Sequence, residues 1–194
     1  ILMGFGVATA AGLVTEIGDG TTKYGFSYED LVMDVLGAGT GAVIGYLDAD
    51  DLIGFRYGFL LPKSGSATCC QVPGLGPDYS NHIYTGDLKL DGLARRLGFS
   101  IGPLKYLMLS ATYGTKSYPT GLPENRERLV GIEIGLNFQK ILDDVGVRRT
   151  TWWGYALHTV FDNVRIPFTA VGMRYDLNHG EWHGPDNGNT FLSR

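Results

Sequence analysis

Four carboxylates near the start of the chain are the residues best placed to do chemistry. Glu16 and Asp19 end one apolar segment, and Asp30 and Asp34 begin the next. If the two segments fold back as a helical hairpin, the four acids gather at one end of it. Clustered carboxylates raise one another's pKa values, and acids at membrane depth are costly and often functional. The cluster therefore predicts either a proton, cation or polar-headgroup site, or a set of acids that cap a helix and bind Lys23 or water. The second interpretation is favoured.

Small residues spaced four apart predict how the two segments pack. Each glycine in a helix costs about 1 kcal/mol relative to alanine, so repeated glycine indicates close approach of a neighbouring helix. In lipid this is the small-xxx-small packing face. Ser27 predicts the N-cap of the second helix, with Asp30 in its first turn. The predicted packing residues are Gly4, Ala8 and Gly12 in the first segment and Gly37, Gly41 and Gly45 in the second.

These motifs resemble those of a known family. Glu16-Ile-Gly-Asp19, then Phe26-Ser27-x-x-Asp30-Leu-x-x-Asp34-x-x-Gly37-x-x-x-Gly41, resembles the closing motif of VanZ-like membrane proteins and, more closely, the YfiM-type predicted periplasmic lipoproteins. The VanZ-like pattern has Gln in place of Asp19, Asn in place of Asp34, and an earlier helix with an Asp/His pair that this sequence lacks. The rest of the chain resembles, more loosely, the β-rich C-terminal part of the longer YfiM-type proteins. The resemblance implies an envelope location and no established activity.

The composition is typical of an outer-membrane β-protein. The 194 residues include 29 glycines and 11 tyrosines, only 19% are charged, and mean hydropathy is close to zero. Alternating membrane strands give no long apolar run, and none here reaches the roughly 20 residues of a spanning helix. A net charge of −4 without a basic stripe excludes nucleic acid as a partner. Because the chain starts at Ile1, we expect that a signal peptide or an earlier helix precedes it.

Alternation and turn residues predict an α+β protein with an antiparallel sheet of about five strands. Ile83 to Phe99 fits a strand that bends at Gly92, although a helical stripe also fits. Residues 1–50 form the hairpin domain, 51–178 the β-rich domain and 179–194 a loose polar tail. Strands are expected at 52–61, 83–99, 106–114, 128–138 and 166–177, a helical turn at 139–145, and an aromatic helix from Thr150 or Thr151 to about Asn163.

The other chemical motifs are weak. His179 and His183 flank Glu181, but only a helix would bring the two rings to one face, and the neighbouring glycines disfavour a helix. Vicinal Cys69 and Cys70 have neither zinc nor redox spacing, which favours small loop residues over acylation or intermolecular bridging. Asp48-Ala-Asp-Asp51 lacks the spacing of a calcium loop, and Asp78, Ser80 and His82 do not have the spacing of a triad. We expect no metal and no cofactor.

These observations predict a structural or accessory subunit of a bacterial envelope assembly, most consistent with the outer membrane, in contact with lipid and a protein partner. Five strands are fewer than a closed membrane barrel needs, so the sheet is expected to be open or completed by a partner. The alternative is a lipid- or glycan-handling enzyme or transporter that uses Glu16, Asp19, Asp30 and Asp34. The sequence does not decide whether the protein is an enzyme, and it favours a protein without catalytic activity.

Overall fold

The computed structural model describes residues 1–21, 25–59, 82–116 and 123–186. The chain divides into two compact units, Ile1–Asp51 and Leu52–Arg194. Helices and an antiparallel sheet together make an α+β protein, as the sequence predicts. Cys69, Cys70, Asp78, Ser80 and Lys23 lie outside the described residues.

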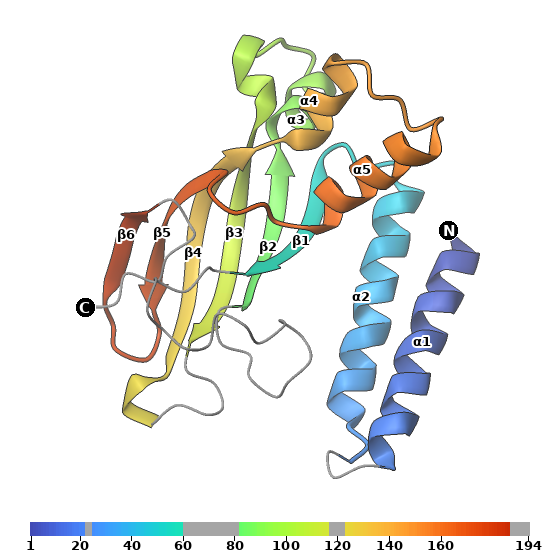
Figure 1. Cartoon of the computed structure of the whole chain (residues 1–194), viewed down its shortest axis with the longest axis vertical. Coiled ribbons are helices and arrows are strands. Elements are labelled where there is room, and N and C mark those ends of the chain that lie inside the picture. The colour runs from blue at the N-terminus through green and yellow to red at the C-terminus, as the bar shows by residue number, and fades with distance from the viewer. Residues whose placement is uncertain (22–24, 60–81, 117–122, 187–194) are drawn as a thin grey trace. The chain divides into compact units, whose positions relative to one another are not determined.

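The first unit is a pair of helices, α1 (Leu2–Gly20) and α2 (Tyr28–Tyr46), which pack side by side (Figure 1). Ser27 is the N-cap of α2, because its Oγ accepts a 3.1 Å hydrogen bond from the backbone N–H of Asp30. This confirms the predicted helix start. Within the described residues, neither helix nor any other combines the length and apolar character needed to cross a membrane.

The packing face of α1 differs from the predicted one. Gly12 does face α2, since a Cβ at this position would collide with Asp34. A Cβ added at Gly4, Gly37 or Gly41 would meet no atom within 4 Å, whereas one at Gly45 would lie 3.7 Å from Ile1. In a helix of 3.6 residues per turn, residues spaced four apart are rotated by about 40° from one to the next. Several such steps carry the later residues away from the face that contacts the other helix. The partly or fully buried residues of α1 are Phe5, Thr9, Gly12, Glu16 and Asp19, and Ala8 is exposed.

The second unit is built on one open six-stranded sheet in which each strand pairs antiparallel with the next along the chain. The sequence predicts about five strands. The sixth lies within the segment expected to be a loose tail, where residues 182–186 pair with the preceding strand. The strands are β1 (Ile53–Phe59), β2 (His82–Lys89), β3 (Leu107–Lys116), β4 (Glu127–Leu136), β5 (Ala170–Asp176) and β6 (Trp182–Asp186).

Three helices lie near one end of this sheet: α3 (Leu90–Arg96), α4 (Phe138–Asp144) and α5 (Trp152–Asn163) (Figure 1). Thr151 caps α5 as predicted, by accepting a hydrogen bond from the N–H of Gly154. The expected strand over residues 83–99 is wrong in its second half, where the helical stripe prevails and the chain turns into α3. Two 3₁₀ turns, η1 (Gly102–Tyr106) and η2 (Pro123–Asn125), complete the described elements.

The two faces of the sheet have opposite chemistry. Every strand from β1 to β5 places apolar side chains on one face, here called the apolar face, and many of them are exposed. In an ordinary soluble domain this face would be covered by the core, so the arrangement is inverted. The exposed large side chains of the apolar face include Ile53, Phe55, Tyr84, Leu109, Tyr113, Ile132, Ile134, Leu136, Val171 and Met173.

The opposite face, here called the polar face, is buried although it carries charges and hydroxyls. Glycines at Gly58, Gly131 and Gly172 bring neighbouring backbone close on this side, since a Cβ at each would collide with backbone or with a side chain of the adjoining segment. The buried polar residues of this face include Arg56, Thr85, Asp87, Lys89, Ser110, Thr112, Glu133, Arg174 and Asp176.

An aromatic row crosses the apolar face at a single register level. Strand pairing places Tyr57 opposite Tyr84, Tyr84 opposite Tyr113, and, beyond Val130, Tyr175 opposite Trp182. Tyr57 and Tyr84 are in ring contact at 5.1 Å, as are Tyr175 and Trp182 at 5.2 Å. The aromatic row therefore consists of Tyr57, Tyr84, Tyr113, Tyr175 and Trp182.

Candidate functional site

Buried ion pairs occupy the middle of the polar face. Arg56 donates two hydrogen bonds to Asp87, at 2.5 and 2.9 Å. Arg165, which follows α5, donates two to Glu133 at 2.9 Å each, and Arg174 adds a third at 3.4 Å. Removing charges from water is costly unless each is paired and hydrogen-bonded, which these are. The pairs therefore let the sheet keep a charged face inside and an apolar face outside.

Hydroxyl groups lie among these ion pairs. Ser110 stands in register between Asp87 and Glu133, and Thr112 stands opposite Thr85. Neither the Ser110 nor the Thr112 hydroxyl has a hydrogen-bond partner within the described residues, and both are buried. Buried polar groups are usually satisfied by protein or ordered water, so this part of the polar face suits hydration more than an apolar ligand.

A second polar group joins the sheet to its helices. Lys89, at the end of β2, donates to the side chain of Gln139 on α4 and lies 3.4 Å from the Asp162 carboxylate on α5. Burial raises the pKa of Asp162, and the charges of Lys89 and Arg149 only partly oppose this effect. These contacts fix α4 and α5 against the end of the sheet.

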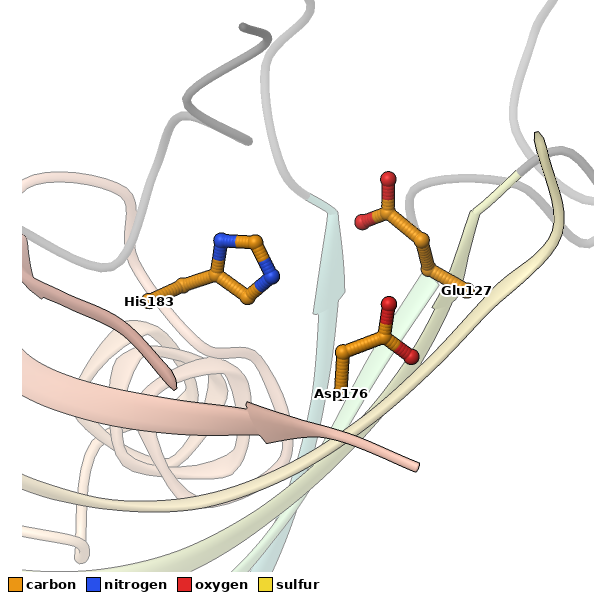
Figure 2. A group of neighbouring side chains, drawn as sticks. All are labelled: Glu127, Asp176 and His183. Atoms are coloured by element: carbon orange, nitrogen blue, oxygen red, sulfur yellow. The ribbon is translucent and has the colours of Figure 1, made fainter. Parts of the chain in front are cut away.

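Glu127, Asp176 and His183 form a third group on the polar face, at the end that carries the aromatic row (Figure 2). One potential ligand atom from each lies within 4.8 Å of the other two. Asp176 is 1% exposed, and its carboxylate accepts hydrogen bonds from the N–H of Asn178 and from the His179 ring. The hydrogen bond to Asp176 raises the pKa of His179.

Of the four predicted carboxylates, Glu16 acts as a helix-capping group. Glu16 is only 5% exposed, and its carboxylate accepts a 3.0 Å hydrogen bond from the N–H of Ser27, at the start of α2. Asp34 lies beside Gly12, Asp30 is exposed and Asp19 is partly buried. Within the described residues, no three of these acids bring their carboxylate oxygens together as Glu127, Asp176 and His183 bring their ligand atoms.

No helix brings His179 and His183 to one face, in agreement with the prediction from the neighbouring glycines. His179 lies in the turn after β5, bonded to Asp176 and to the carbonyl of Glu124, and His183 lies on β6. His158 is buried on α5, and its ring Nε2 lies 3.0 Å from the carbonyl oxygen of Val147, which fits a structural role.

The group of Glu127, Asp176 and His183 cannot be predicted from the sequence, because it depends on the register of the strands. The residues come from three different strands, and nothing in their local spacing relates them. The single available signal is the placement of Glu127 and Asp176 at strand ends.

No family model matches the chain, and comparison with curated proteins and with solved structures gives no match. The resemblance to YfiM-type and VanZ-like proteins therefore stays a prediction.

Proposed function

We propose that the protein is a structural or accessory subunit of a bacterial envelope assembly, seated in the outer membrane with the apolar face of its sheet against lipid. The inverted sheet carries this proposal. Apolar side chains point outward on five successive strands while paired charges are buried behind them. Membrane β-proteins alternate in this way, with apolar residues toward lipid and polar residues inside.

The aromatic row supports the same orientation. Tyrosine and tryptophan concentrate where hydrocarbon meets water, because their rings are apolar and their O–H or N–H groups are polar. On β4 the apolar side chains Val130, Ile132, Ile134 and Leu136 extend from the row to one side, and Arg128 lies on the other. The strands β3 and β4 have 10 residues each, which matches the roughly 9–11 residues of a tilted membrane strand.

The free edge of the sheet favours a subunit over an isolated protein. Among the described residues, β6 pairs on one side alone, with β5. Unpaired backbone groups are expensive in hydrocarbon, so a sheet edge in lipid needs another strand or a protein cover. On β1, Tyr57 already accepts a hydrogen bond of 3.0 Å from the N–H of Arg165. A partner at β6 is therefore part of the proposal.

The alternative function, lipid or glycan handling by the N-terminal acids, has less support. Glu16 is engaged in holding the start of α2, which is a structural task. Asp34→Asn tests the alternative directly, because the VanZ-like pattern has Asn at this position. We expect unchanged assembly and growth. Loss of a measurable activity in a variant that remains folded and correctly located would overturn the accessory role.

Detergent extraction of native envelopes, followed by size analysis and mass spectrometry, tests the proposed function. We expect the chain in the membrane fraction and in a particle much larger than itself, with one partner at constant stoichiometry. A small species that contains this chain alone would contradict the subunit role, and recovery in the aqueous fraction without detergent would contradict the membrane location.

A further inference from the structure

Three strands bring Glu127, Asp176 and His183 together at one end of the polar face. Glu127 opens β4, Asp176 closes β5 and His183 is the second residue of β6. The register pairs Leu129 with Asp176 and Arg174 with His183, so the three side chains leave the sheet on the same side. Figure 2 shows the imidazole and the two carboxylates around a common space.

The donor set suits a borderline transition-metal ion. One imidazole nitrogen with two carboxylate oxygens provides mixed nitrogen and oxygen ligands and two negative charges. Zinc accepts histidine, aspartate and glutamate at about 2.0–2.2 Å in tetrahedral sites, which places neighbouring ligand atoms about 3.4 Å apart. The ligand atoms lie within 4.8 Å of one another, so the partly exposed Glu127 and His183 side chains must rotate toward Asp176 when the ion binds. Calcium is a poorer fit because it takes six to eight oxygen ligands.

The surroundings already hold the ligands in place. The Asp176 carboxylate accepts hydrogen bonds from the ring and backbone of His179 and from the N–H of Asn178, and a carboxylate with about four lone-pair sites keeps one for a metal. Outer hydrogen bonds of this kind orient metal ligands. Lys116 bonds Oε1 of Glu127 at 2.6 Å, which leaves Oε2 to coordinate. The His183 ring makes no hydrogen bond or ion pair with another described residue, so its nitrogens are available.

We propose that Glu127, Asp176 and His183 bind one Zn²⁺ ion, which ties β6 to β4 and β5. A water molecule completes the tetrahedron. The ion holds the last described strand of the sheet in place, at the edge where the backbone is paired on one side. This site does not depend on the membrane location, because its ligands come from the polar face.

Isothermal titration of the full chain, stripped with chelator and kept in mild detergent, tests the site with ZnCl₂ as the probe. We expect one zinc per chain and a thermal midpoint that rises on saturation. His183→Ala and Glu127→Gln should each weaken zinc binding by more than about tenfold, because loss of a mere hydrogen-bond partner of a ligand already costs about 10–100-fold. Co²⁺ should give visible absorption bands that His183→Ala removes.

Glu181→Gln is the matched control, because this exposed carboxylate lies two residues from His183 and outside the group. It should bind zinc like the parent chain. Circular dichroism in the absence of metal verifies that each variant is folded. The proposal is overturned if the parent chain does not bind zinc, or if folded His183→Ala and Glu127→Gln bind it as tightly as the parent.

Discussion

Arg165 donates two parallel hydrogen bonds, each 2.9 Å long, to the two carboxylate oxygens of Glu133. The Arg165 side chain is fully buried and that of Glu133 is 1% exposed. Arg174 approaches the same carboxylate, so one acid serves two guanidinium groups. This pair connects the segment after α5 to the centre of β4, among the buried side chains of the polar face.

Glu133→Leu should strongly destabilise the second unit. The variant leaves the fully buried Arg165 guanidinium without the carboxylate that pairs with it, and breaking a buried pair in this way costs about 3–5 kcal/mol. Arg95→Gln is the control, because it breaks an ion pair whose arginine side chain is 60% exposed and should cost less than about 1 kcal/mol. Denaturant unfolding in one detergent measures both. Equal decreases in the free energy of unfolding of the two variants would show that the buried Glu133 pair contributes no more stability than the exposed pair.

Ile132→Lys should impair membrane insertion if the apolar face meets lipid. Ile132 is 62% exposed in the middle of that face, where a lysine in hydrocarbon costs about 2–4 kcal/mol. In water the same exposed substitution costs little. Leu177→Lys is the matched control, since Leu177 is also exposed but lies beyond Tyr175 of the aromatic row, in the chain that leaves β5.

Folding yield into lipid vesicles, compared with stability in detergent, measures the two lysine variants. The expected result is a lower yield for Ile132→Lys and a nearly normal one for Leu177→Lys. Parent-like insertion by Ile132→Lys would argue that the apolar face contacts something other than hydrocarbon.

Local patterns in the sequence were sufficient for some elements. The period of two in residues 128–138 predicts both faces of β4, because alternation along a strand is a local property. Ser27 and Thr151 mark helix starts for the same reason, since a cap acts within three residues. The split of the chain into a helical pair and a sheet also follows from local periodicity.

The features that depend on pairing between distant residues could not be predicted from the sequence. The aromatic row joins Tyr57 to Trp182 through the register of intervening strands, which no local spacing encodes. The strand that begins at His82 ends at Lys89, where the Lys89 amine contacts Gln139 and Asp162. The alternation of apolar and charged residues continues to Leu90, so the sequence does not show where this strand ends. The sequence of β6 is that of a polar tail, and only its pairing with β5 identifies it as a strand.

Asp144→Asn should reduce stability at neutral pH and lose this effect in acid. The Asp144 carboxylate accepts hydrogen bonds from Lys105, Lys140 and Tyr106, which link η1 to α4. The hydrogen bond from Lys105, followed by that from Lys140, holds the pKa of Asp144 well below its usual value. A depressed pKa in the folded state gives stability that is present above the unfolded pKa, near 3.9, and is lost as pH falls through the folded pKa.

The stability difference between the parent and Asp144→Asn should therefore be constant from pH 7 to about pH 5 and shrink below about pH 4. Unfolding midpoints across this range measure it, with Glu181→Gln as an exposed acid outside the network. A difference that persists undiminished to the lowest pH at which the parent stays folded would assign the effect to shape and not to charge.

Gly12→Ala and Gly4→Ala should change the helical pair in opposite directions. The added methyl at Gly12 would lie 2.9 Å from Cβ and Cγ of Asp34, so α1 must move away from α2. At Gly4 the methyl meets no atom within 4 Å, and alanine there should stabilise α1 by up to about 1 kcal/mol through helix propensity. Hydrogen exchange of peptides from residues 1–51 in the full chain reads this unit separately from the sheet. We expect faster exchange for Gly12→Ala and slower exchange for Gly4→Ala. If both alanines slow exchange, propensity outweighs contact and Gly12 is not a packing residue.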